Sequence, residues 1–172
     1  ITDAVTRPVV SGFMAGTVAR SDLIDKQNMR PGDQILLTKG VSLEGTAIIA
    51  REFRERLMEL GMTGEELQNC RQYLARISIL EEAKIASGCP GVSAMHDITE
   101  GGVATAVVEL GLAGGYGLII QKDRIPVFAE TKKICSLLDL DPLGLIGSGG
   151  LLISCRKEQV ESLTKGIHTA GI

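Results

Sequence analysis

The sequence predicts a single α+β domain, in which helices pack against a mixed β-sheet. The length of 172 residues is typical of one domain that buries about two-thirds of the surface of its unfolded chain. Strand-like and helix-like segments alternate irregularly, and some neighbouring strands have only short connections, which argues against a regular doubly wound sheet. Aromatic residues make up only 3% of the chain, so the core must consist mainly of aliphatic side chains.

The first half is predicted to hold two strands and two helices. The segment 5–19 is rich in β-branched residues, a polar loop covers 21–30, and a turn at Pro31-Gly32-Asp33 precedes a buried strand at 34–38. Apolar residues at three- and four-residue spacing predict a helix at 44–60. Thr63 and Glu66 have the spacing of a capping box and predict a second helix that continues to about Ala86.

The second half is predicted to alternate strands and helices. After a break at 88–91, a strand is expected at 92–95 and a helix from Gly102 to the glycine pair Gly114-Gly115. The remaining predicted elements are a strand at 117–121, an extended edge at 125–127, a helix at 128–138, strands at 143–146 and 150–154, and a closing helix at 157–169.

Composition excludes several classes of function. The net charge of -3 provides no basic face for nucleic acid, and no apolar run approaches the ~20 residues that span a bilayer. The four cysteines form no Cys-x-x-Cys pair, so we expect reduced, buried thiols, no metal site and a cytoplasmic location. Because the chain begins at Ile1 without an initiator Met, we expect it to be part of a longer protein.

The segment 95–103 combines a strand end, a polar turn and a glycine pair at a helix start. The first turn of a helix leaves backbone N–H groups unpaired, and these favour an anion such as phosphate. Asp97 could orient a metal-bound phosphate or accept a proton, and Thr99 is placed to cap the helix. A structural alternative stays open, in which Thr99 caps, Gly101 and Gly102 allow tight packing, and Asp97 fixes the turn.

This segment resembles the C-terminal-domain motif of the AIR synthase-related superfamily. That superfamily includes aminoimidazole ribonucleotide synthase, selenophosphate synthetase, thiamine-monophosphate kinase and a hydrogenase maturation protein. Three further segments match in the same order: the Pro-Gly-Asp strand from Pro31, the glycine loop from Gly40 to Gly45, and the late segment 141–153 around Gly147-Ser148-Gly149. The resemblance covers nearly the whole chain, so one such domain is expected over 1–172.

The resemblance implies a three-layer α/β/α fold and a role in ATP-dependent phosphoryl transfer. Members have an N-terminal domain that supplies most ligands of Mg²⁺ and ATP and forms a homodimer, and a nucleotide and a small-molecule substrate bind between the two domains. The present chain would then be a monomer or weak dimer that is inactive alone. Asp97 is the implied catalytic residue, and the implied phosphate-binding residues are Thr99, Glu100, Gly101, Gly102, Gly45, Ser148 and Gly149.

Two carboxylates depart from the pattern of the superfamily. Glu100 stands where the hydrogenase-maturation branch tends to carry a basic residue, and Glu44 stands where members often have His or Asn. An anionic side chain beside a phosphate is unfavourable unless a cation lies between them. The motif segments of this sequence nevertheless resemble those of the hydrogenase-maturation-like branch most. A non-catalytic binding or assembly module with the same fold stays open as an alternative function. His96 could act as a proton shuttle or be an ordinary turn residue, and both interpretations stay open.

Overall fold

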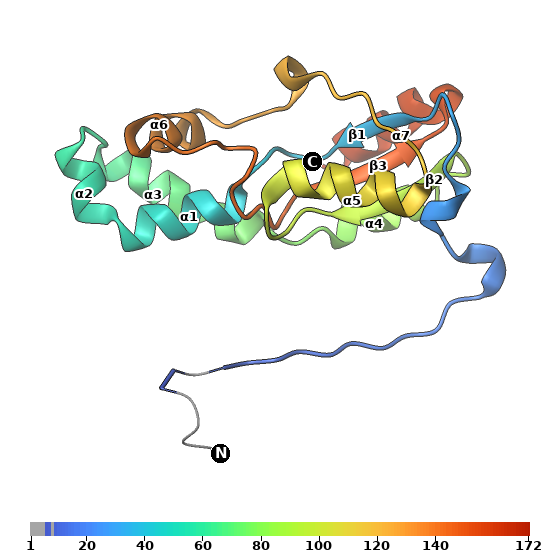
Figure 1. Cartoon of the computed structure of the whole chain (residues 1–172), viewed down its shortest axis with the longest axis horizontal. Coiled ribbons are helices and arrows are strands. Elements are labelled where there is room, and N and C mark those ends of the chain that lie inside the picture. Colours follow the sequence, from blue (N-terminus) through green and yellow to red (C-terminus); the bar gives the residue numbers. More distant parts are fainter. Residues whose placement is uncertain (1–5, 8) are drawn as a thin grey trace.

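The sheet contains three short strands in the computed structural model, which describes residues 6–7 and 9–172 (Figure 1). The strands β1 (Gln34–Leu37), β2 (Val92–Asp97) and β3 (Leu151–Cys155) lie in the order β1-β3-β2, and both pairings are antiparallel. Ile153 of the central strand lies opposite Leu36 on one side and Met95 on the other. The α+β class is confirmed, but the described sheet is antiparallel where a mixed sheet was predicted.

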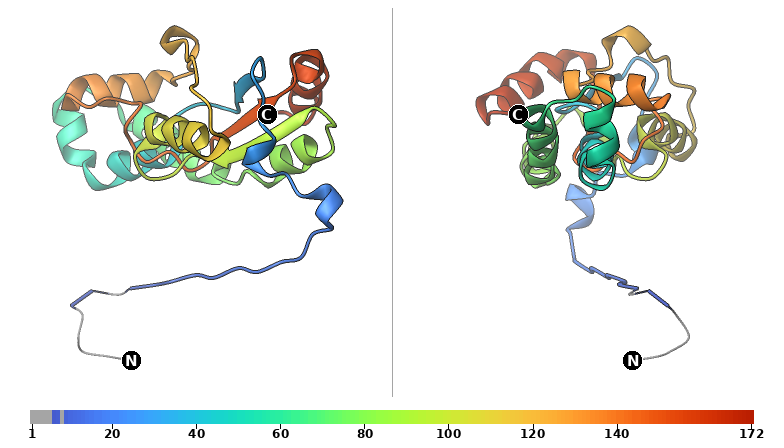
Figure 2. Two further views of the ribbon diagram at one scale, coloured as in Figure 1. Left: turned by 45° about the vertical axis from the view of Figure 1, so that its right-hand side comes forward. Right: turned by 90° about the vertical axis from the view of Figure 1, so that its left-hand side faces the viewer.

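Helices cover both faces of this sheet. Leu152 of β3 belongs to a core shared with α5 (Gly102–Gly114), whereas Ile153 belongs to a core shared with α4 (Leu80–Ser87) and α7 (Val160–Thr169). Figure 2 shows α5 on one side of the sheet and α4 and α7 on the other. Every residue of β3 is buried, because side chains on both faces of a central strand meet a helix layer. The three-layer arrangement is therefore confirmed.

A second group of helices packs beside the end of the sheet (Figure 1). It consists of α1 (Leu43–Glu52), α2 (Arg54–Glu59), α3 (Gly64–Gln72) and α6 (Ala129–Leu138). The core of this group is aliphatic, as the scarcity of aromatic residues predicts, and its fully buried members include Leu57, Leu67 and Ile134. The predicted capping box is confirmed: the Glu66 amide donates to the Thr63 hydroxyl at 3.2 Å, and the Thr63 amide donates to the Glu66 carboxylate at 2.7 Å.

Both long helices predicted in the first half are interrupted. Phe53, with φ of -108°, separates α1 from α2. The second helix divides into α3, a 3-10 turn at Tyr73–Arg76 and α4. The Lys39 ammonium donates to the carbonyl oxygens of Arg76 and Ser78 at 2.9 and 2.8 Å. These are the acceptors that a continuous helix would use for its own amides, so the side chain of Lys39 stabilises the break.

Three predicted strands are wrong within the described residues. Residues 9–19 are extended and exposed, and Figures 1 and 2 show them apart from the body of the domain. Val5, where this segment was expected to begin, lies outside the described residues. The segment 117–121 pairs with no strand, since Leu118 packs against the α5 core while Ile119 is 96% exposed. The segment 143–146 is irregular because its carbonyls serve helix ends, as described below.

The cysteines are free thiols, as expected, and Cys70, Cys135 and Cys155 are buried. Burial raises the pKa of both Cys70 and Cys155 to about 11, so these two thiols are poor nucleophiles.

No helix of the described residues is both long and apolar enough to cross a bilayer.

A buried carboxylate clamps the start of β1 to the end of β3. The Asp33 side chain is 5% exposed and accepts hydrogen bonds from the Arg156 guanidinium and from the hydroxyls of Ser93 and Ser154. The Arg30 amide donates to the same carboxylate at 3.0 Å. Burial raises the pKa of Asp33, but these hydrogen bonds outweigh it, so that the pKa lies below its usual value of 3.8.

The clamp predicts acid sensitivity. Because the pKa of Asp33 is lowered by folding, its stabilisation is complete above the unfolded-state pKa of about 4 and is lost as the pH falls through the lower folded-state value. We expect Asp33→Asn to reduce the free energy of unfolding by about 1–3 kcal/mol at pH 7. Urea unfolding of both proteins at pH 7, 5 and 3 measures this. A difference between them that stays constant down to pH 3 would contradict the ionic role of Asp33.

Candidate functional site

The loop formed by residues 142–150, hereafter the central loop, brings the predicted site segments together. The Gly45 amide donates to Ile146 O at 3.0 Å, and the Gly147 amide donates to Thr99 O at 3.1 Å. The Ile98 amide donates to Gly150 O at 3.0 Å. Backbone hydrogen bonds therefore join the glycine loop, the β2–α5 turn and the Gly-Ser-Gly segment, three regions that are far apart in the sequence.

Two helix N-termini meet this loop. The Ala104 amide of α5 donates to Leu143 O at 3.1 Å, and Ile146 O accepts the Gly45 amide of α1. The Ser42 hydroxyl at the start of α1 also donates to Pro142 O. Helix N-termini carry unpaired donors and a positive partial charge, which carbonyl oxygens can satisfy. These bonds hold 143–146 in an irregular path, so the strand predicted there does not form.

The β2–α5 turn presents some of the predicted donors and buries others. Glu100 and Gly101 are exposed, and no backbone acceptor for their amides is found among the described residues. The amide of Gly102, by contrast, is buried and donates to Thr99 O at 3.1 Å. Two adjacent N–H groups at 100–101 are thus available to an anion. The N–H group of Gly102 is already hydrogen-bonded to Thr99 O within the chain.

Thr99 does not cap the helix with its side chain. The N-cap position belongs to Gly101, and no side chain caps this end of α5. Thr99 contributes its carbonyl oxygen instead, which accepts from both Gly102 and Gly147. The expectation of a threonine cap is therefore wrong, because the left-handed conformation of Gly101, at φ of 77°, moves the helix start two residues further along.

The glycines of the site have structural roles in addition to any role with a ligand. A Cβ on Gly101 would overlap the Thr105 side chain. A Cβ on Gly45 would lie 2.9 Å from Ile146 O, and one on Gly149 would lie 3.1 Å from the Ile77 Cα. Gly45 and Gly149 are buried, whereas Ser148 is half-buried. Close packing at the central loop accounts for glycine at 45 and 149, and the Thr105 side chain accounts for glycine at 101. The contact of these residues with phosphate stays a prediction.

Three carboxylates belong to the predicted site segments or lie directly beside them. The Asp97 side chain, at the end of β2, is 59% exposed, and Glu100 is exposed beside it. Glu44 lies in the first turn of α1, and its Oε2 atom is buried with no hydrogen-bond partner among the described residues. A buried polar atom without a partner is rare in folded proteins. A phosphate bound on this side would therefore need a cation between it and these carboxylates.

His96 lies directly before Asp97 and is held by two charged side chains. The Lys26 ammonium is 2.9 Å from His96 Nδ1, and the Glu109 carboxylate is 2.9 Å from Nε2. Neither Lys26 nor Glu109 was singled out from the sequence, because they lie 70 and 13 residues from His96 and no local spacing connects them. His96 lies within β2 and is therefore not a turn residue, and both of its ring nitrogens have hydrogen-bond partners. A role in proton transfer stays a prediction.

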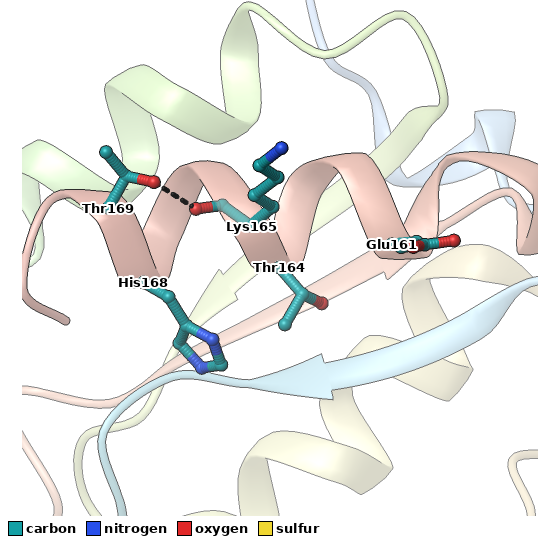
Figure 3. Close-up of a pocket in the computed structure, with 5 residues that line it drawn as sticks. All are labelled: Glu161, Thr164, Lys165, His168 and Thr169. Atoms are coloured by element: carbon teal, nitrogen blue, oxygen red, sulfur yellow. Dashed lines mark hydrogen bonds between the residues drawn. The ribbon is translucent and has the colours of Figure 1, made fainter.

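A surface hollow lies away from this region, on the face of the sheet that α7 covers. It is an open hollow of about 580 Å³ beside α7, lined by Glu161, Thr164, Lys165, His168 and Thr169 (Figure 3). All five residues come from one helix, and Thr169 donates to the Lys165 carbonyl of that same helix at 2.8 Å. A hollow with a single wall cannot enclose a ligand. No group of three or more potential metal ligands occurs among the described residues.

Comparison with known proteins gives a consistent set of matches. The family model described as AIR synthase related protein, C-terminal domain, matches residues 30–172. A putative hydrogenase expression/formation protein of Methanocaldococcus jannaschii is 30% identical over 162 residues, which are 94% of this chain and 45% of that protein. The carbamoyl dehydratase HypE of Escherichia coli is 29% identical over 143 residues, which are 83% of this chain and 39% of that protein.

Solved structures agree with these matches. A crystal structure of E. coli HypE superposes with a TM-score of 0.68 at 28% identity, over 84% of this chain and 41% of that one. The structure of a HypE protein in complex with ATP superposes with a TM-score of 0.62 over 87% of this chain and 42% of that one. Its identity of 19% makes that likeness one of fold alone. The chain spans less than half the length of these relatives.

Proposed function

Residues 30–172 place the chain in the family described as AIR synthase related protein, C-terminal domain. From this membership we propose that the chain is the C-terminal domain of a phosphoryl-transfer enzyme and completes its ATP-binding cleft. The observation that carries the proposal is the convergence of three motif segments on the central loop. Two helix N-termini meet there, and the amides of Glu100 and Gly101 remain open beside them. Such an arrangement of donors suits a phosphate group or a developing negative charge.

The proposed enzyme requires a preceding domain of the same polypeptide. The relatives are more than twice as long as the matched region, which leaves room for a second domain that supplies Mg²⁺ ligands. The extended segment before β1 exposes large apolar side chains, among them Phe13 at 95% and Met14 at 94%. Exposed apolar surface of this size is unusual in a protein that lacks a partner. In the full protein we propose a homodimer in which the preceding domain provides the other wall of the cleft.

Asp97 is the proposed catalytic residue of this half. Its carboxylate is exposed at the end of β2, one turn before the open amides, and no hydrogen bond occupies it among the described residues. In phosphoryl transfer the protein mainly positions groups and stabilises charge. A free carboxylate at this place can accept the proton of an attacking group or orient an acceptor. The phosphate charge itself would be balanced by Mg²⁺ and by groups of the preceding domain.

The substrate class follows from the branch of the family. The matched relatives are named as hydrogenase expression/formation and carbamoyl dehydratase proteins, so we propose ATP-dependent activation of an oxygen acceptor on a small molecule of the carbamoyl type. Glu100 and Glu44 distinguish this chain from the pattern of that branch. Glu100 precedes Gly101 of the β2–α5 turn, and Glu44 precedes Gly45, whose amide bonds to the central loop. They favour one second candidate: a module that keeps the fold but binds a partner in place of ATP.

ATP titration of the full-length protein tests the proposed ATP-binding function. We expect saturable binding of Mg–ATP to the full protein. In the chain 1–172 alone we expect only weak NMR shifts, centred on residues 97–103, because one wall of the cleft is missing. The matched variant Asp97→Asn removes the charge at nearly constant volume, and it should lower turnover by at least about 100-fold without changing the urea midpoint. A full-length protein that binds no nucleotide would leave only the second candidate.

A further inference from the structure

The contacts of His96 define its protonation state. A lysine ammonium has hydrogen-bond donors and no acceptor. The nitrogen 2.9 Å from it, Nδ1 of His96, must therefore be an acceptor without a proton. In the neutral imidazole the other nitrogen, Nε2, then carries the proton and donates to the Glu109 carboxylate at 2.9 Å. The ring is thus a neutral bridge between a cation and an anion, and its side chain is only 15% exposed.

Lys26 comes from a part of the chain that is itself firmly held. It begins a 3-10 turn, Lys26–Asn28, whose preceding Asp25 carboxylate accepts the Gln27 amide at 3.0 Å. Met29 follows with 4% exposure and packs beside Gly114 at the end of α5. The ammonium is therefore delivered to His96 from a fixed backbone and does not sample the solvent freely.

Asp97 is the other charged group beside the ring. Its Oδ1 atom lies 3.9 Å from the same Nδ1 atom, too far for a hydrogen bond. A protonated Nδ1 would pair with this carboxylate after a small rotation. The charged groups that contact the ring within the described residues are Lys26, Asp97 and Glu109. Of these, Lys26 decides whether Nδ1 is free to bond with Asp97.

We propose that Lys26, His96 and Glu109 are positioning residues that keep the Asp97 carboxylate unpaired. Lys26 occupies Nδ1, and Glu109 fixes the proton on Nε2, so His96 cannot donate to Asp97. The inference rests on the catalytic role proposed for Asp97. It also places one cation within a side-chain length of a site otherwise bordered by carboxylates, where it moderates their charge.

The tautomer of His96 tests the arrangement without any activity measurement. In a long-range ¹H–¹⁵N NMR spectrum of the ¹⁵N-labelled chain at pH 7.5, we expect an unprotonated Nδ1 and a protonated Nε2. In Lys26→Met we expect Nδ1 to take up a proton of its own in a large share of molecules, in addition to the proton that Glu109 holds on Nε2, while Lys26→Arg restores the wild-type pattern. Lys122→Met, at an exposed lysine, serves as the control and should change nothing. A protonated Nδ1 in the wild type, or an unchanged pattern in Lys26→Met, overturns the proposal.

Turnover of the full-length protein provides the second readout. Lys26→Met should lower kcat about tenfold or more, which corresponds to one hydrogen bond to a charged group, while KM for ATP stays within about twofold. A rise in KM alone, with kcat unchanged, overturns a role through Asp97. If the wild-type protein shows no ATP-dependent turnover, the proposed function fails, and the NMR result still decides the hydrogen-bond arrangement independently.

Discussion

Lys39→Met is expected to lower the free energy of unfolding by about 3–5 kcal/mol, because it leaves a buried carboxylate without its counter-charge. The Lys39 ammonium lies 2.7 Å from the Glu82 carboxylate, and the two side chains are only 7% and 2% exposed. The same ammonium donates to two backbone carbonyls at the break between α3 and α4. This single substitution therefore removes a buried ion pair and also the hydrogen bonds that stabilise the interruption between α3 and α4.

Urea unfolding with matched variants measures this effect. Lys84→Met removes a lysine that pairs with Glu81 at 2.9 Å, but both of these side chains are more than two-thirds exposed, so its cost should stay below about 1 kcal/mol. The double variant Lys39→Met/Glu82→Met should recover much of the loss, since it leaves no buried charge. A Lys39→Met protein as stable as Lys84→Met would show that the buried pair contributes little.

The sequence predicted the elements whose signals are local. The capping box at Thr63 and Glu66 is present as its spacing predicts, and α5, α6 and α7 follow their apolar periodicity. The break between α3 and α4 was missed because its cause is not local: the ammonium of Lys39 reaches carbonyls 37 and 39 residues away. The segment 143–146 reads as a strand because it is apolar. Its carbonyls are nevertheless used by two helix N-termini.

The site was predictable as a set of segments and not as an arrangement of atoms. Motif spacing placed Asp97 at a strand end and glycines at a helix start, and the structure has both. It could not indicate that the Gly102 amide is already bonded, nor that Lys26 reaches His96 from a separate turn. Contacts made across 70 residues depend on tertiary packing, which no local pattern records.

Gly102→Ala is expected to cause the largest local disruption of the proposed cleft, with a loss of about 2–5 kcal/mol in the free energy of unfolding. Gly102 has φ of +64°, a conformation that L-residues adopt at a cost. A Cβ there would also overlap the Leu143 carbonyl oxygen and lie 2.6 Å from that of Leu145. The central loop would have to move away from α5, and the Ala104–Leu143 hydrogen bond would break.

The opposite end of the same helix offers a control that separates these two causes. Gly115 has φ of +75°, yet a Cβ on it would meet nothing within 4 Å. Gly115→Ala should therefore pay only the backbone cost, about 1–2 kcal/mol, and leave ATP binding of the full-length protein intact. Gly102→Ala should abolish that binding even in buffer where the protein is still folded, because the loop that joins the two helix N-termini is displaced. Equal losses of stability in the two variants, with ATP binding retained in both, would mean that contact between the central loop and α5 is not what builds the cleft.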